Sequence, residues 1–219
     1  MDRFMKRVRY VQSRGFKSTI VFDGRRLPAK GITDAKRRET RQKNAQKAAE
    51  LEQADQGDTQ AAHAAYNKSF VVTNKLIHQA FEELKKQGIP VFIAPHEGDA
   101  QCAWFAHFSY ADVVVTRDSD LIVHGCKCVF FWNARYHKSS DLGGGKLYWR
   151  PYLSRMQKEG ADWRFVGDNW DRFIETCVIA GCDYCAGIKG VGITTAMELM
   201  QEHSTMANVV RAIQADRVR

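Results

Sequence analysis

The stretch Val113-Val114-Val115-Thr116-Arg117-Asp118-Ser119-Asp120 contains the pattern from which the fold class is predicted. Four β-branched residues in a row are typical of a short buried strand, and the acidic residues begin where that strand should end. The pattern occurs twice earlier, in Ile20-Val21-Phe22-Asp23-Gly24 and in Val91-Phe92-Ile93-Ala94-Pro95-His96-Glu97-Gly98-Asp99. A further β-rich run spans residues 129–132. With helical stretches between these runs, the sequence predicts an α/β protein with a mainly parallel sheet.

Two long helices are predicted in the connection between the first strand and the second. Residues 36–54 are rich in Arg, Lys, Gln, Glu and Ala, and a second helical run covers residues 59–87, ended by Gly88 and Pro90. The first run has few large apolar residues, so we expect it to project from the core. Residues 141–146 lack the Lys-Ser/Thr arrangement of a phosphate-binding loop and predict a hairpin or surface loop. From residue 170 the pattern is helical, with a break at residues 181–192.

Charge is distributed unevenly along the 219 residues, which carry a net charge of +8. Residues 1–47 contain 15 basic and 4 acidic side chains, whereas residues 48–219 contain 18 basic and 21 acidic ones. A basic block beside an acidic body suits a protein that holds a polyanion with one part and metal cations with another. A solvated basic helix is the alternative that composition leaves open.

The cysteines and the N-terminus bear on the cellular compartment. The pairs Cys126/Cys128 and Cys182/Cys185 invite a zinc hypothesis, but no histidine lies at zinc-finger spacing from either pair. We expect reduced, mostly buried thiols. The first residues, Met1-Asp2-Arg3-Phe4-Met5-Lys6-Arg7, do not resemble a signal peptide, and the apolar runs are too short to cross a bilayer. An intracellular protein without membrane partners is expected.

Acidic residues at three strand ends are the main chemical signal. The carboxyl ends of parallel strands are where open α/β sheets build their sites, so Asp23, Glu97, Asp99, Asp118 and Asp120 are expected to converge. Taken singly, each could be a turn former or a helix N-cap. Together they would repel one another without cations, and oxygen ligands favour Mg²⁺ or Mn²⁺ over Zn²⁺. A two-metal site would hydrolyse phosphodiester bonds.

Basic and glycine-rich segments flank these acids. Lys30 and Arg37 are the best candidates for contacting a scissile phosphate, whereas Arg38 and Lys43 are expected to be solvated or to contact the nucleic-acid backbone. The segment Gly187-Ile188-Lys189-Gly190-Val191-Gly192 opens a helix and would present backbone N–H groups to a DNA phosphate, although an ordinary interhelical turn has the same signature. Asp183, just before it, could turn back toward the metals.

Taken together, the segments resemble the structure-specific 5′ nuclease superfamily of flap endonucleases, exonuclease 1 and the xeroderma group G nuclease (Rad2 type). The resemblance rests on Val21-Phe22-Asp23-Gly24, residues 94–101, Thr116-Arg117-Asp118-Ser119-Asp120-Leu121, and Gly181-Cys182-Asp183-Tyr184 with the glycine turn that follows. These motifs occur in the family's order and approximate spacing. The segments around Glu97-x-Asp99 and residues 22–41 resemble exonuclease 1 more than flap endonuclease.

The resemblance implies a PIN-like (Rossmann-like) core at residues 1–165, with a helical arch at about residues 30–73 and a helix–two-turn–helix DNA-binding region at residues 166–219. It implies Lys30 and Arg37 as the catalytic basic pair, and DNA contacts through Arg38, Arg41, Lys189, Gly190 and Gly192. It also implies K⁺ at the helix–two-turn–helix. The implied metal ligands, for two Mg²⁺ ions that Mn²⁺ can replace, are Asp23, Glu97, Asp99, Asp118, Asp120 and Asp183.

The sequence also departs from the family pattern. Family members begin with a Met-Gly-led strand that supplies another metal-binding Asp, and this segment is expected to be missing here. His96 and Gly98 stand where the exonuclease 1 group commonly has Tyr and Ala, and Gly98 is expected to loosen the following helix by about 1 kcal/mol. The long tail through which such nucleases bind a sliding clamp or mismatch-repair proteins is likewise expected to be absent.

Three functions remain open at this point. The favoured one is a Mg²⁺-dependent 5′→3′ DNA exonuclease and 5′-flap endonuclease in repair or replication, located in the nucleus of a eukaryote and acting on DNA with a 5′ end, flap or nick. The second is a catalytically impaired, structure-specific DNA-binding fragment of the same family. The third, an RNA-cleaving nuclease with a similar sheet, is disfavoured by the glycine turn and the arch.

Overall fold

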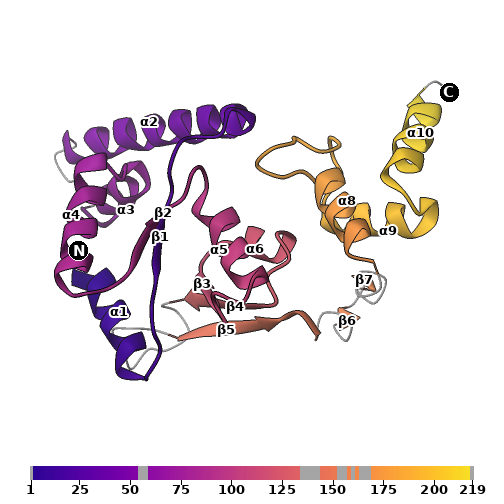
Figure 1. The fold of residues 1–219 in the computed structure, drawn as a ribbon. Helices are drawn as coiled ribbons and strands as arrows, with labels where there is room; N and C mark the ends of the chain where they lie inside the picture. Colours follow the sequence, from indigo (N-terminus) through magenta and orange to yellow (C-terminus); the bar gives the residue numbers. More distant parts are fainter. Residues whose placement is uncertain are drawn as a thin grey trace.

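The computed structural model describes residues 2–53, 59–133, 144–151, 157–158, 161–162 and 169–217. Its first part consists of α1 (Asp2–Ser13), β1 (Ile20–Phe22), η1 (Pro28–Lys30), α2 (Gly31–Gln53), α3 (Thr59–Ser69) and α4 (Asn74–Lys86). The middle consists of β2 (Val91–Ile93), α5 (Gly98–His107), β3 (Val114–Thr116), α6 (Asp120–Val123), β4 (Cys128–Asn133) and β5 (Gly144–Trp149). The last part consists of β6 (Gln157–Lys158), β7 (Ala161–Asp162), α8 (Trp170–Ala180), α9 (Ile193–His203) and α10 (Met206–Arg217). The α/β class predicted from the sequence is confirmed (Figure 1).

The strands form small, mainly parallel sheets. β1 pairs with β2 in parallel, with Val21 opposite Phe92, and β3 pairs with β4 in parallel, with Val115 opposite Phe130. β5 runs antiparallel to β4, and the short β6 and β7 pair with each other. In the described residues, β1–β2 and β3–β4–β5 are separate sheets, whereas the sequence suggested a continuous one.

Helix α5 joins the two sheets because it contacts both β1 and β3. The core beneath it contains Ala103, Val114, Leu121, Cys126 and Val129, which are all buried. A second cluster packs α1 against α4 and the β1–β2 pair through Met5, Val8, Leu84 and Ile89. The strand ends are therefore fixed by apolar packing on both sides of the acidic segments.

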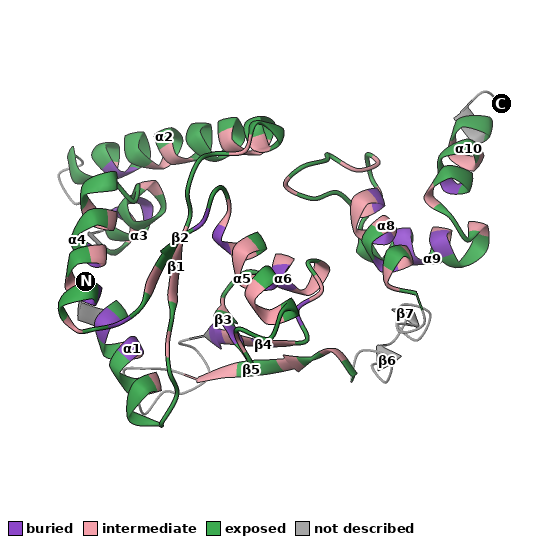
Figure 2. Cartoon of the chain, viewed as in Figure 1, coloured by how far each residue is buried: buried purple, intermediate pink, exposed green. Residues whose placement is uncertain are grey.

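The helical predictions need two corrections. Residues 59–87 do not form one helix: α3 ends at Ser69 and α4 begins at Asn74. The hydroxyl of Thr73 accepts a hydrogen bond from the backbone N–H of Leu76 and caps the new helix, a signal that the sequence reading overlooked. Helix α1 was not predicted, although Met5 and Val8 form a buried face at helical spacing. Helix α2 is exposed along most of its length, as its scarcity of apolar residues predicted (Figure 2).

Three helices form the C-terminal part of the fold. Ile179 of α8, Ala196 and Met200 of α9 and Val209 of α10 form one buried cluster. Phe173 of α8 packs against Ile122, Val123 and Tyr148, so this unit contacts the β3–β5 region. The predicted boundary at residues 165/166 lies outside the described residues, as do residues 141–143 of the predicted hairpin or loop at residues 141–146. Residues 144–146 begin β5, which forms a hairpin with β4. No helix in the described part has the length and apolar character to cross a membrane.

Candidate functional site: an acidic cluster beside the start of a basic helix

Backbone contacts tie the carboxyl ends of β1 and β2 together. The N–H of Gly24 donates to the carbonyl of His96 (2.6 Å), and the carboxylate of Asp23 accepts from the N–H of Gly98 (2.7 Å). Gly24 has no room for a side chain, because a Cβ there would overlap the carbonyl oxygen of Ala94. A Cβ on Gly98 would lie 3.1 Å from the Asp23 carboxylate, so glycine at 98 lets that carboxylate approach the start of α5.

A hollow of about 570 Å³ lies at the ends of β1 and β3. Three predicted metal ligands line it: Asp23 after β1, Asp99 in the first turn of α5 and Asp118 after β3. The Asp118 carboxylate accepts a hydrogen bond from the N–H of Asp120 (3.1 Å), which fixes the turn into α6. The structure therefore brings three of the five acids that were predicted to converge to one hollow, whereas Glu97 and Asp120 do not line it.

Burial and mutual repulsion both raise the pKa values of acids in this cluster. Burial, followed by the charges of Asp118, Asp23 and Asp120, raises the pKa of Asp99 to about 6. Burial and the charges of Asp118 and Asp183 also raise the pKa of Asp120. Such a cluster holds more negative charge than its surroundings balance, which is the electrostatic condition that a divalent cation relieves.

The start of the basic helix meets a second group of acids. Lys30 Nζ, at the end of η1, lies 2.8 Å from Glu97 Oε1 and 3.2 Å from Asp183 Oδ2. Arg37, in the second turn of α2, donates to the same Asp183 oxygen at 2.8 Å. Only 14% of the Lys30 side chain is exposed, against 54% for Arg37, so Lys30 is the more enclosed of the two cations. Both predicted catalytic basic residues thus lie at predicted metal ligands.

Two polar residues that the sequence analysis did not select complete this group. The Tyr184 hydroxyl donates a hydrogen bond to Glu97 Oε2, and the Thr33 hydroxyl donates to the Asp183 carbonyl (2.9 Å). Burial and the bond to Glu97 raise the pKa of Tyr184 to about 12. Partial burial alone would lower the pKa of Lys30, but its bonds to Glu97 and Asp183 outweigh that effect and raise it. The adjacency of Tyr184 to Asp183 was the signal in the sequence.

The acids lie near one another, but in the described residues they do not form a complete coordination site for a metal ion. Within the described ranges, no three His, Cys, Asp or Glu side chains are grouped closely enough to hold an ion. The donor set nevertheless fits a hard cation, because it consists of carboxylate oxygens, and burial together with the neighbouring acids raises the pKa of Asp99. Asp23, Asp99 and Asp118 line the hollow, whereas Glu97 and Asp183 face Lys30.

The predicted DNA-contacting residues lie on α2 and at the turn before α9. Arg38 is exposed on α2, and half-buried Arg41 donates to the carbonyl of Arg37 (3.1 Å). Lys189 and Gly190 are exposed in the turn before α9, and Gly192 is the N-cap of that helix. Gly190 has φ +83°, a conformation that favours glycine.

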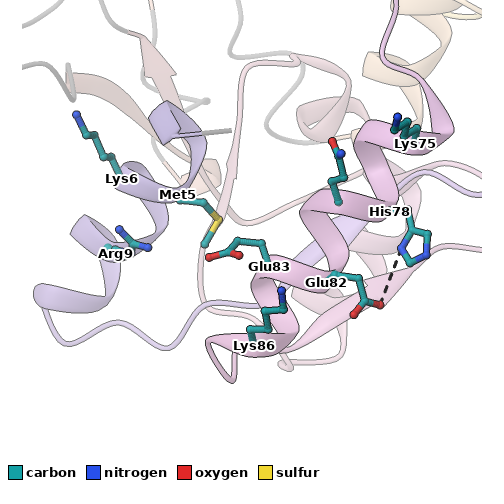
Figure 3. A pocket seen from close by; sticks show the side chains of 9 residues that line it. Met5, Lys6, Arg9, Lys75, His78, Glu82, Glu83 and Lys86 are labelled. Atoms are coloured by element: carbon teal, nitrogen blue, oxygen red, sulfur yellow. Dashed lines mark ion pairs between the residues drawn. The ribbon is translucent and has the colours of Figure 1, made fainter.

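A larger hollow, of about 760 Å³, lies between α1 and α4. Met5, Lys6 and Arg9 come from α1, whereas Lys75, His78, Glu82, Glu83 and Lys86 come from α4 (Figure 3). Its side chains carry both signs of charge, and His78 lies 3.9 Å from Glu82. It includes none of the predicted site residues.

The cysteines are free thiols, as predicted, but they are less buried than expected. Cys126 is buried and Cys102, Cys128 and Cys177 are half-buried, whereas Cys182 and Cys185 are exposed. Burial raises the pKa of Cys102, Cys126 and Cys177 to about 11 in each case, so these three are poor nucleophiles at neutral pH.

Comparisons with known proteins define the class of this chain. Residues 88–183 match the XPG I-region family model, and this range contains all of the six predicted metal acids except Asp23. Exonuclease 1 of Oryza sativa subsp. japonica is 31% identical over 207 residues, and exonuclease 1 of Xenopus laevis is 32% identical over 199 residues. The chain is covered to 94% and 90% in these alignments but spans only 23% and 25% of the two relatives. Flap endonuclease 1 of Plasmodium chabaudi chabaudi is 30% identical, with 95% of the chain and 43% of the relative covered.

Solved structures show the same fold. The catalytic core of Rad2 in complex with DNA substrate aligns with a TM-score of 0.65 at 24% identity, over 94% of this chain and 53% of that one. Human GEN1 in complex with Holliday junction DNA aligns with a TM-score of 0.58 at 18% identity, over 99% and 49%. The fold and the sequence matches place the chain among PIN-like nucleases. It belongs to the XPG/Rad2 superfamily of structure-specific 5′ nucleases and resembles exonuclease 1, as the sequence motifs indicated.

Proposed function

We propose that this chain is a divalent-metal-dependent nuclease that hydrolyses phosphodiester bonds in DNA with a 5′ end, flap or nick, acting as a 5′→3′ exonuclease and 5′-flap endonuclease. The observation that carries the proposal is the meeting of Lys30 and Arg37 with Glu97 and Asp183, beside the hollow lined by Asp23, Asp99 and Asp118. Carboxylates suit cations and the basic pair suits a phosphate, so both partners of a metal-assisted phosphoryl transfer have residues to receive them.

The metal ligands in this proposal are Asp23, Glu97, Asp99, Asp118, Asp120 and Asp183, and the cations are two Mg²⁺ ions, which Mn²⁺ can replace. When bound, such a pair supplies a hydroxide nucleophile at neutral pH and stabilises in-line displacement at phosphorus. Lys30 and Arg37 exchange their carboxylate partners for the oxygens of the scissile phosphate. Arg37 can offer two parallel N–H donors, whereas Lys30 acts as a compact charge.

DNA outside the cleavage site is held by two elements in this proposal. Arg38 and Arg41 of α2, the helix that forms most of the proposed arch at about residues 30–73, contact the backbone of the DNA. Lys189, Gly190 and Gly192 precede α9, whose first N–H groups have no side-chain cap at Gly192 and can receive a phosphate. We retain the division into a core at residues 1–165 and a DNA-binding region at residues 166–219, with K⁺ on backbone carbonyls near the glycine turn.

A cellular role follows from the same proposal. Hydrolysis of 5′ flaps and recessed 5′ ends belongs to DNA repair or replication, which in a eukaryote takes place in the nucleus. Sliding-clamp or mismatch-repair proteins are the partners that this role would involve.

A catalytically impaired, structure-specific DNA-binding protein is the second candidate. It is favoured by one observation: across the described residues, no three acids are grouped closely enough to ligate an ion. In this case the basic helix and the glycine turn would still bind DNA, and the raised pKa of Asp99 would be a remnant of lost metal binding.

The deciding experiment uses a duplex with a labelled 5′ flap or recessed 5′ end, in Mg²⁺ and separately in Ca²⁺. We expect short 5′ products with Mg²⁺, and their loss in Asp118→Ala with DNA binding retained. Asp112→Ala is the matched control because Asp112 is exposed before β3 and does not line the hollow. Normal turnover by Asp118→Ala would show that the assigned site is wrong, and binding without cleavage by the unaltered chain would establish the second candidate.

A further inference from the structure

Tyr184 contacts both members of the most enclosed ion pair in the acidic site. Its hydroxyl donates to Glu97 Oε2, and its ring centroid lies 4.8 Å from Lys30 Nζ. Lys30 Nζ in turn lies 2.8 Å from Glu97 Oε1. Three residues that are far apart in the sequence therefore form a closed set of pairwise contacts.

The backbone holds Tyr184 in place. Asp183 and Tyr184 are the two central residues of a turn whose ends, Cys182 and Cys185, exchange two backbone hydrogen bonds of 2.8 and 3.2 Å. The carbonyl of Asp183 accepts a hydrogen bond from Thr33, and its carboxylate accepts one from Arg37. The turn is thus attached to the start of α2, the segment that immediately follows Lys30.

Lys30 needs such a support because a lysine side chain is long and loses considerable rotamer entropy when it is fixed. A carboxylate fixes the ammonium from one side, and an aromatic face adds a cation–π contact within about 6 Å of the ring centroid. The Tyr184 hydroxyl also restrains Glu97, so the same residue orients both partners.

We propose that Tyr184 is a positioning residue for Lys30. It holds the Lys30 ammonium group at the acidic site, so that the side chain is already in the right conformation when the scissile phosphate binds. The role rests on the proposed nuclease function. When a phosphate replaces Glu97 as the partner of Lys30, the ring contact can persist, because a cation–π contact is an attraction to the ring face and does not require the bond between Lys30 and the carboxylate. The ring is therefore the essential part, and the hydroxyl serves the state in which Glu97 is the partner.

Two substitutions separate ring from hydroxyl. Tyr184→Phe keeps the aromatic face and removes the bond to Glu97, whereas Tyr184→Leu removes both. In single-turnover cleavage we expect Tyr184→Leu to lower the rate constant about tenfold or more, a loss that corresponds to the free energy of one cation–π contact. The rate constant of Tyr184→Phe should stay within about threefold of that of the unaltered chain. DNA affinity in Ca²⁺ should change little in either variant.

A double substitution tests whether Tyr184 acts through Lys30. In a Lys30→Met background, Tyr184→Leu should cause almost no additional loss, because the group that it positions is gone. A full and additive loss in that background would overturn the proposal. A Tyr184→Leu variant that cleaves at the normal rate would overturn it as well.

The position of Lys30 is measured without cleavage by NMR of the ¹³C-lysine-labelled chain. The Tyr184 ring should shift the ε-CH₂ protons of Lys30 upfield, and Lys30→Arg assigns the signal by removing it. We expect the shift to survive Tyr184→Phe and to vanish in Tyr184→Leu. Tyr110→Leu is the control, since the exposed Tyr110 ring stacks on Trp104.

The two readouts separate the two hypotheses. An unaltered chain that fails to cleave DNA would count against the nuclease function, while the NMR signal would still decide the role of Tyr184. A Lys30 signal that is unshifted in the unaltered chain, or that is the same in Tyr184→Leu, would overturn the proposed contact. Unfolding temperatures of all variants verify that they are folded.

Discussion

Asp99 is a proposed metal ligand whose ionised carboxylate lowers the stability of the folded chain. Its carboxyl group is half-buried in the first turn of α5, near Asp23, Asp118 and Asp120, and its pKa is raised from 3.8 to about 6. Because the folded state then binds a proton more tightly than the unfolded state, this residue lowers stability as the pH rises from about 4 to about 6.

Asp99→Asn removes that titration. In EDTA we expect the variant to unfold at a higher temperature than the unaltered chain at pH 7, and the difference to shrink at pH 4, where Asp99 is protonated in the folded state. Adding Mg²⁺ should narrow the difference at pH 7, because a cation stabilises the ionised acid. Asp112→Asn serves as the control, and a difference that does not depend on pH would contradict the assigned cause.

The sequence located these acids but not their partners. Asp23, Asp99 and Asp118 follow apolar runs, and parallel pairing brings strand ends together, so a local pattern was enough to predict the hollow. The set formed by Lys30, Glu97 and Tyr184 has no such pattern. It depends on how the turn at Cys182–Cys185 packs against the start of α2, which no spacing in the sequence specifies.

At the scale of elements, the turn between α8 and α9 contains two glycines with similar backbone angles and different surroundings. Gly187 has φ +67° and Gly190 has φ +83°, both in the region that side chains disfavour. A Cβ on Gly187 would overlap the backbone of Gly181 and Ile179, whereas a Cβ on Gly190 would meet nothing within 4 Å.

This difference predicts unequal costs. Gly190→Ala should lower the free energy of unfolding by about 1–2 kcal/mol, the cost of a left-handed residue, whereas Gly187→Ala adds a backbone clash and should cost clearly more. Urea denaturation of both variants measures this. Equal costs would mean that the turn relaxes around Gly187. If Gly190→Ala also weakens DNA binding while it remains folded, the turn contributes to the DNA surface.

Element boundaries were predicted where local chemistry decides them. The strands at residues 20–22 and 114–116 and the helices α8, α9 and α10 followed from β-branched runs and helical periodicity. The break at residues 70–73 was missed because the flanking segments both favour helix, and a single capping threonine divides them. The division of the strands into two sheets is a tertiary property that strand propensity does not encode.

At the scale of the whole molecule, the question is whether the net charge of +8 or its placement governs DNA binding. Residues 1–47 carry 15 basic and 4 acidic side chains, and much of this charge lies on the exposed face of α2. Attraction by net charge alone would weaken equally on loss of any cation, whereas a local backbone contact releases counterions only where it forms.

Arg38→Gln and Lys85→Gln remove the same charge from different places. Arg38 is exposed on α2, and Lys85 is exposed on α4, which is not part of the proposed DNA surface. In titrations with Ca²⁺ at several salt concentrations, Arg38→Gln should reduce the slope of log K against log salt by about 1, whereas Lys85→Gln should leave it unchanged. Equal slopes for both variants would mean that the molecule attracts DNA through its overall charge, and that α2 does not form a specific part of the DNA-binding surface.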